Sequence, residues 1–281
     1  MEAGTRSQLE ALGIDPRKSL GQNFLVHSAD AERIAAAVDA TPDDAVIEIG
    51  PGIGALTRPL LQRAGAVIAI ELDPRLVEVL RSTLGGTPSL TVVHADALTV
   101  DFAALLAQHA PTARQVRFAA NLPYYITSAA IRKMLESGLP WRKLVVTVQL
   151  EVAQRMTAKP GEMSLMSVSA QFYGIPALIT RLGAGAFHPP PGVDSAVIAV
   201  TPHPAPLYDD PAALFALARA GFGQKRKQLI NTLSAGTGLS KIDTAELLLR
   251  AHIDPSRRPE TLSIAEWIAL AAAQKAYRPP E

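Results

Sequence analysis

Short runs of apolar, β-branched residues alternate with helical stretches along the first two thirds of the chain. The runs between residues 44 and 150 are almost continuously apolar, which is typical of parallel strands buried on both faces. Strands are predicted at residues 45–49, 66–70, 90–94, 116–120, 143–150, 177–182 and 196–201, with helical segments at about 55–64 and 163–174. The pattern predicts an α/β fold with a mostly parallel seven-stranded sheet, whose last two strands could pair as an antiparallel hairpin.

A proline-rich stretch at residues 202–206 separates two parts of the chain. Beyond it the pattern is helical. Asp210-Pro211 is a helix start, and Ser263 to Glu266 form a capping box that opens the last helix. We therefore expect two domains: a sheet-containing domain with an N-terminal arm at residues 1–203, and a small all-helical domain at residues 204–281.

The composition excludes several classes of protein. Hydrophobic residues make up 48% of the chain and charged residues 19%, so a sizeable core can be buried. The absence of cysteine excludes disulfides and thiolate metal sites, and the six scattered histidines predict no metal. We find neither a signal peptide nor an apolar run of spanning length, which predicts a cytoplasmic protein that does not bind membranes. No exposed apolar stripe is evident, so we expect a monomer.

A glycine-rich turn, residues 50–54, follows the first predicted strand. Glycines there let the backbone approach a ligand closely. Glu71 ends the next strand, where a carboxylate can accept from both hydroxyls of a ribose, and Asp96 ends the third, where it can accept from an exocyclic amine. The turn alone fits dinucleotides, nucleotides or S-adenosylmethionine, and the two acids could be solvated strand ends. Together, in register, they favour a cofactor site, and the glycine spacing slightly favours S-adenosylmethionine.

The tetrapeptide Asn121-Leu122-Pro123-Tyr124 follows the fourth predicted strand. The lone pair of an adenine N6 amine is delocalised into the ring, so this nitrogen is a poor nucleophile. The Asn121 side-chain oxygen and the Leu122 carbonyl could accept hydrogen bonds from both N6 protons, with Pro123 stiffening the turn and Tyr124 stacking on the base. The alternative is an ordinary turn after a strand.

Several motifs occur together in a characteristic order. They are Arg17 to Leu25, Ile47 to Gly54, Asn121 to Tyr124, Phe187 to Ala196, and the basic run Lys225-Arg226-Lys227. With them the sequence closely resembles the ribosomal RNA adenine dimethyltransferase family, specifically the small-subunit enzymes that make dimethyladenosine. The resemblance implies a Rossmann-like class I methyltransferase fold with S-adenosylmethionine as cofactor.

The resemblance also implies roles for individual residues. Cofactor contacts are implied at Asn23, Leu25, Gly50, Glu71, Asp96 and Asn121. It implies that Tyr124 and Phe187 sandwich the target adenine, although Phe187 beside three prolines could instead be a loop anchor. Two departures stand out. Residues 162–167 replace the usual Tyr-Gly-x-Leu-Ser stretch, and Tyr125 stands where asparagine is common.

The function expected from the resemblance is dimethylation of two adjacent adenines in a small-subunit (16S) ribosomal RNA hairpin loop during ribosome biogenesis. The substrate would be this RNA or an assembling small subunit. Candidate RNA-binding residues are Arg17, Lys18, Lys225, Arg226 and Lys227, although a short charge run is often only a solvated face. The alternatives are a large-subunit (23S) adenine methyltransferase giving antibiotic resistance, a methyltransferase of protein glutamine or DNA adenine, and a non-catalytic RNA-binding factor.

Overall fold

A computed structural model describes residues 5–17, 20–224 and 226–277. The chain divides into two compact units. The first comprises Met1–Ala153 with Pro176–Pro202, and the second comprises Gln154–Ile175 with His203–Glu281. The chain therefore crosses between the units three times, within α7 (Leu150–Met156), at the start of β7 (Gly174–Leu182) and after Pro202.

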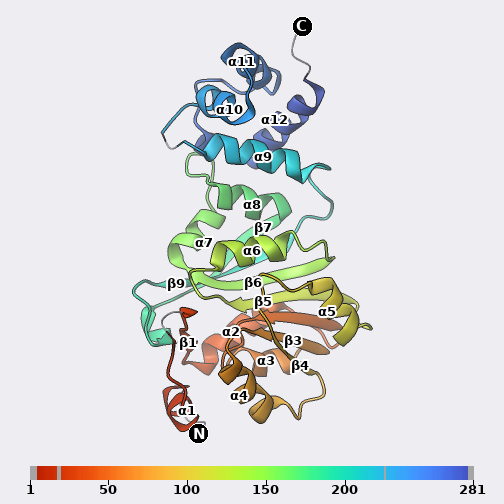
Figure 1. Ribbon diagram of the computed structural model, residues 1–281, viewed down its shortest axis with the longest axis vertical. Coiled ribbons are helices and arrows are strands. Elements are labelled where there is room, and N and C mark those ends of the chain that lie inside the picture. The colour runs from red at the N-terminus through yellow and green to blue at the C-terminus, as the bar shows by residue number, and fades with distance from the viewer. Residues whose placement is uncertain (1–4, 18–19, 225, 278–281) are drawn as a thin grey trace. The chain divides into compact units, whose positions relative to one another are not determined.

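The core of the first unit is a seven-stranded sheet in the order β4-β3-β2-β5-β6-β9-β7 (Figure 1). The neighbouring pairs among β2 to β6 are parallel, and β9 runs antiparallel to β6. The strand order reverses beside β2, so the carboxyl ends of β2 and β5 flank the crevice where open α/β sheets bind ligands. Besides β7, the strands are β2 (Asp44–Ile49), β3 (Ala66–Glu71), β4 (Leu90–His94), β5 (Gln115–Asn121), β6 (Trp141–Gln149) and β9 (Ser195–Pro202).

Helices cover both faces of this sheet. Val46 of β2 belongs to a buried cluster with Ile34 and Leu60 of α2 and α3, whereas the adjacent Ala45 packs with Ala110 beyond α5. Successive strand residues point to opposite faces, so β2 is buried along its whole length, and its sequence is apolar except for Asp44 and Glu48. The helices are α1 (Thr5–Ala11), α2 (Ser28–Val38), α3 (Thr57–Leu61), α4 (Pro74–Leu84), α5 (Phe102–His109) and α6 (Thr127–Leu135).

A second, two-stranded sheet ties the N-terminal arm to a late segment of the chain. β1 (Phe24–Leu25) pairs antiparallel with β8 (Phe187–His188), which follows the short 3₁₀ turn η2 (Ala184–Ala186). Leu25 lies opposite Phe187 in this pair, and both side chains are buried. Neither strand was predicted from the sequence, because two-residue strands leave no periodic signal.

The regular elements among the described residues of the second unit are helices, apart from the first residues of β7. Its core gathers Val168 and Phe172 of α8 with Leu214 and Phe215 of α9 and with Trp267 of α12. Besides α7, its elements are α8 (Leu165–Tyr173), α9 (Pro211–Phe222), α10 (Leu229–Thr237), α11 (Lys241–Arg250), η3 (Pro259–Thr261) and α12 (Ile264–Ala276).

The predicted α/β fold with a mostly parallel seven-stranded sheet is confirmed. The predicted helix after the glycine turn is shorter than expected, because α3 spans only Thr57–Leu61. The structure also differs from the expected domain ranges, since Gln154–Ile175 belongs to the second unit. The ring centroids of Phe172 and Phe215 lie 5.4 Å apart, so α8 contributes to the helical core rather than to the sheet.

Candidate active site

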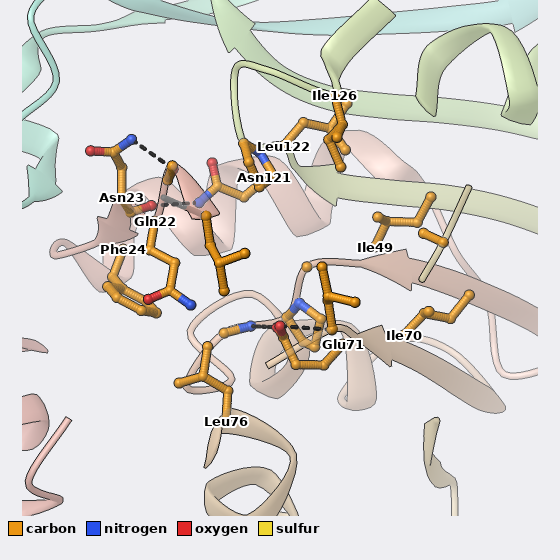
Figure 2. A pocket seen from close by; sticks show the side chains of 18 of the residues that line it. Gln22, Asn23, Phe24, Ile49, Ile70, Glu71, Leu76, Asn121, Leu122 and Ile126 are labelled. Atoms are coloured by element: carbon orange, nitrogen blue, oxygen red, sulfur yellow. Dashed lines mark hydrogen bonds between the residues drawn. The ribbon is translucent and has the colours of Figure 1, made fainter. Parts of the chain in front are cut away.

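A cavity of about 230 Å³ lies at the carboxyl edge of the sheet in the first unit. The turn after β2, the end of β3, the loops after β4 and β5, and residues 20–25 of the arm all line it (Figure 2). The structure brings to this one cavity the ten residues expected there, which are Asn23, Leu25, Gly50, Glu71, Asp96, Asn121, Leu122, Pro123, Tyr124 and Phe187.

The glycine turn presents bare backbone to the cavity. Gly50 has a φ of 70° and Gly52 a φ of 62°, in the left-handed region that side chains disfavour. A Cβ added to Gly52 would lie 3.0 Å from the Phe24 ring, and one added to Gly50 would lie 3.4 Å from the Asn121 carbonyl oxygen. Side chains at these two positions would therefore fill space between the turn and the residues facing it.

Glu71 is buried at the end of β3 and accepts three backbone hydrogen bonds. Its Oε1 accepts from the amides of Leu72 and Asp73, both at 2.9 Å, and its Oε2 accepts from the Gly52 amide at 3.1 Å (Figure 2). Burial raises the pKa of Glu71, while these three donors act in the opposite direction. A carboxylate has about four acceptor sites, so Oε2 keeps capacity for a further donor. Sequence reasoning expected two ribose hydroxyls here, and the backbone bonds reduce that capacity.

Asp96 follows β4 and is half-buried at the cavity. One carboxylate oxygen, Oδ1, accepts from the Leu98 amide at 2.8 Å, which fixes the side chain on its own loop. The second oxygen accepts no hydrogen bond from the described residues. Asp96 can therefore offer one acceptor to an amine in the cavity.

Glu48 is a buried acid that sequence reasoning did not select. It lies on β2 with 1% of its surface exposed, and Thr57 Oγ1 donates to its Oε2 at 2.7 Å. Burial raises its pKa to about 8, the Thr57 bond lowers the pKa, and the charge of Glu71 raises it further. A charged residue inside an otherwise apolar strand was the signal that could have identified it.

The N-terminal arm is anchored beside the glycine turn by polar contacts. The Gln22 side chain donates to Asp73 Oδ2 at 3.1 Å, and Arg17 lies 3.8 Å from the same carboxylate. Hydrogen bonds from Arg75 are the main reason that the pKa of the buried Asp73 is lowered to about 2. Asp73 also caps α4 by accepting from the Arg75 amide.

Asn121 is the last residue of β5, and its side chain is oriented by the arm. Its Nδ2 donates to the backbone carbonyl of Asn23 at 3.0 Å (Figure 2). This bond uses the amide nitrogen and leaves Oδ1, which accepts from none of the described residues, available at the cavity. The Leu122 amide donates to the Thr147 carbonyl on β6 at 3.4 Å, which holds the following turn against the sheet.

Tyr124 and Phe187 line the same cavity from different parts of the chain. Tyr124 is half-buried, and its hydroxyl lies 2.8 Å from Ser195 Oγ at the start of β9. Burial raises the pKa of Tyr124, and the hydrogen bond with Ser195 acts in the opposite direction. Phe187 is 4% exposed. Ser195 was part of the recognised late motif, but its contact with Tyr124 was not foreseen.

None of the described candidate RNA-binding residues lines the cavity. Arg17 precedes the cavity-lining residues of the arm, with 47% of its side chain exposed. Arg226 and Lys227 are exposed in the second unit, and neither has an ion-pair partner among the described residues. Lys18 and Lys225 lie outside the described residues.

The described residues contain neither a cluster that could bind a metal nor a helix that could span a membrane. Among residues 5–17, 20–224 and 226–277, no group of three His, Asp or Glu side chains could hold a metal ion. In the same part of the chain, no helix combines the length and the apolar character needed to cross a bilayer.

Comparison with known proteins identifies the family. Residues 14–270 match the ribosomal RNA adenine dimethylase family. The chain belongs to this family. A ribosomal RNA small subunit methyltransferase A from Dehalococcoides mccartyi (strain CBDB1) is 45% identical over 94% of this chain and 90% of the relative. A protein of the same name from Pelotomaculum thermopropionicum is 42% identical over 96% of this chain and 95% of its own.

Solved structures agree with the Rossmann-like methyltransferase fold. The 23S rRNA methyltransferase ErmE superposes with a TM-score of 0.70 at 28% identity, over 90% of this chain and 100% of its own. A dimethyladenosine transferase from Plasmodium falciparum superposes with a TM-score of 0.74, over 88% of this chain and 95% of its own, and at 24% identity it supports the fold alone.

Methyltransferases of this family use S-adenosylmethionine. The cavity fits such a molecule, because it combines side-chain-free backbone at Gly50 and Gly52 with acceptors on Glu71 and Asp96. An adenosine moiety carries ribose hydroxyls and an exocyclic amine, which are the donors that these two acids require.

Proposed function

We propose that this protein dimethylates the N6 amines of two adjacent adenines in a hairpin loop of small-subunit (16S) ribosomal RNA, using S-adenosylmethionine. Family membership and relatives at 40–45% identity that are named ribosomal RNA small subunit methyltransferase A support this proposal. Such an enzyme would act during ribosome biogenesis in the cytoplasm, on free RNA or on an assembling small subunit. We expect it to act as a monomer.

Residues of the first unit would hold the cofactor. Gly50 and Gly52 would let the cofactor approach the main chain closely. Glu71 Oε2 would accept a hydrogen bond from a ribose hydroxyl, and Asp96 would accept one from the amine of the cofactor's adenine. Asn23 and Leu25 cover it from the arm, where β1 pairs with β8. When bound, S-adenosylmethionine supplies a methyl group already activated by its sulfonium.

The orientation of the Asn121 side chain carries the catalytic proposal. Its Nδ2 donates to the Asn23 carbonyl and leaves Oδ1 without a donor, and the Leu122 carbonyl also accepts no hydrogen bond from the described residues. These two oxygens accept hydrogen bonds from the two N6 protons and hold the amine in line for methyl transfer. The resulting localisation of the lone pair makes N6 more nucleophilic, and positioning replaces a charged general base.

Tyr124 and Phe187 would hold the target adenine between their rings. An adenine can enter the cavity only after it leaves the base stack, which costs least in a loop. Exposed Arg226 and Lys227, together with Arg17, Lys18 and Lys225, would contact phosphates and orient the loop without reading its sequence.

Methylation of the large subunit is the second candidate, since ErmE is named as a 23S rRNA methyltransferase. The relatives named for the small subunit match at higher identity, 40–45% against 28%. The two candidates predict different substrates for the same chemistry.

Transfer of radiolabelled methyl groups to isolated small and large subunits separates the two candidates, and nucleoside mass spectrometry identifies the product. We expect dimethyladenosine in small-subunit RNA, and much slower labelling with Asn121→Ala as the matched control. Label confined to the large subunit would reject the first candidate in favour of the second. No transfer to either subunit would reject both.

A further inference from the structure

Tyr125 is an aromatic residue that the cofactor and the target adenine do not account for. Its side chain is 59% exposed, whereas every other aromatic residue of the chain is buried or half-buried. It also borders the cavity described above, directly after Tyr124. A large exposed apolar ring beside a binding site is more informative than one elsewhere on a surface.

The ring of Tyr125 is supported on one side. Gly21 of the arm lies against it with a φ of 58°, and a Cβ at Gly21 would be 3.3 Å from Tyr125 Cδ1. The turn that carries Tyr125 is itself held, because the Ile126 amide donates to the Pro123 carbonyl at 3.2 Å and α6 begins at Thr127. The backbone that carries the ring is thus held by its own turn, and Gly21 lies against one side of the ring.

The two consecutive tyrosines of this turn have different environments. Tyr124 is half-buried and bonded through its hydroxyl to Ser195, whereas the Tyr125 hydroxyl has no hydrogen-bond partner among the described residues. Tyr124 thus lines the interior of the cavity, whereas the ring of Tyr125 is exposed at its edge. A strand that delivers one base to Tyr124 must carry the neighbouring base past the rim.

From this arrangement we propose that Tyr125 stacks on the nucleobase next to the target adenine. The inference rests on the proposed function and names a second base subsite for it. When the target base leaves its stack, its neighbour loses a stacking partner, and an exposed aromatic ring replaces that partner. If two adjacent adenines are modified, this neighbour is the second adenine whenever the first occupies the cavity.

The competing role for Tyr125 is a lid on the cofactor, since Gly21 and Tyr125 both border the cavity. Tyr125→Leu keeps apolar bulk but removes the aromatic face, and Tyr125→Phe keeps the face and removes only the hydroxyl. A stacking role requires Phe to behave as wild type and Leu to weaken RNA binding. A lid role requires Leu to weaken cofactor binding instead.

The experiment measures binding of a hairpin RNA and, separately, of S-adenosylmethionine for wild type and both variants. Stacking on an aromatic side chain predicts that Tyr125→Leu binds the hairpin at least about fivefold more weakly. Cofactor affinity should be unchanged in both variants, and Tyr125→Phe should bind RNA as wild type does.

A second hairpin, with an abasic site beside the target adenine, tests whether the neighbouring nucleobase is what stacks on the Tyr125 ring. The affinity of wild type for this RNA should fall by about the same factor as the affinity of Tyr125→Leu for the intact hairpin. The affinity of Tyr125→Leu should not fall further on the abasic hairpin. Equal RNA binding by wild type and Tyr125→Leu, additive losses, or a loss confined to the cofactor would overturn the inference. Wild-type methyl transfer to the intact hairpin is followed in parallel, so failure of the proposed function is seen separately.

Discussion

The hydroxyls of Tyr124 and Ser195 lie 2.8 Å apart, which links the loop after β5 to the first residue of β9. Ser195 is fully buried, and β9 pairs with β6, which in turn pairs with β5. The ring proposed to stack on the target adenine is therefore fixed through the sheet and not by its own loop alone.

This bond predicts a specific effect on catalysis. Tyr124→Phe and Ser195→Ala each remove it while keeping the ring, so each should lower kcat for methyl transfer by about two- to tenfold. Cofactor affinity, measured by calorimetry, should stay at the wild-type value. The double variant should be no slower than the slower single one, because both changes remove the same interaction. Additive losses would show that the two residues act separately.

Asn121→Ala should have the largest effect on the chemical step. It removes the proposed acceptor for an N6 proton, and we expect the single-turnover rate at saturating cofactor and RNA to fall by roughly 100-fold. Asn121→Asp is the matched comparison, because it keeps an oxygen at the cavity but loses the donor to the Asn23 carbonyl. A near wild-type rate for Asn121→Ala would refute the lone-pair argument.

The sequence predicted the residues at the strand ends but not the contacts that orient them. Gly50, Glu71 and Asn121 follow strands, and parallel strands bring such positions to one edge by topology alone. The Asn121–Asn23 bond joins residues 98 positions apart and depends on how the arm packs. The assignment of Gln154–Ile175 to the second unit was not predicted, for a related reason. Its crossings lie inside α7 and β7, without linker composition.

Replacing Glu71 should weaken cofactor binding and also lower the stability of the fold. Glu71→Ala removes an acceptor for the cofactor, so we expect binding to weaken by about 1.5–3 kcal/mol. The free energy of unfolding should also fall, because the amides of Gly52, Leu72 and Asp73 lose their acceptor. Glu78→Ala, at an exposed position on α4, should change neither quantity. Unchanged calorimetric affinity in folded Glu71→Ala protein would remove Glu71 from the cofactor site.

Glu48 predicts a pH dependence of stability. Its pKa is raised to about 8 in the folded protein, against an ordinary value of 4.5, so the folded state holds a proton that the unfolded state has lost. The free energy of unfolding should therefore fall as the pH rises from 4.5 to about 8. Glu48→Gln is uncharged throughout and should gain stability over wild type across this window, by roughly a few kcal/mol above pH 8. Urea unfolding at pH 5, 7 and 9 checks this, and a pH-independent difference would contradict it.

RNA binding should depend on salt through the basic segment Lys225-Arg226-Lys227. Each phosphate contact to a single strand contributes about 0.7 to the slope of log affinity against log salt, so replacing all three by alanine should reduce the slope by up to about 2. Cofactor affinity should not change, because the cavity is lined by the first unit alone. Lys241→Ala, an exposed lysine elsewhere in the second unit, is the control for loss of charge.

Titrating RNA binding at several salt concentrations gives this slope for each protein. A shallower slope with the triple variant, and a wild-type slope with Lys241→Ala, would assign phosphate contacts to the segment rather than to net charge. Identical slopes for the triple variant and wild type would mean that the segment is a solvated face. The arm would then be the next candidate, since Arg17 is 47% exposed and lies 3.8 Å from Asp73, too far for a tight ion pair to occupy it fully.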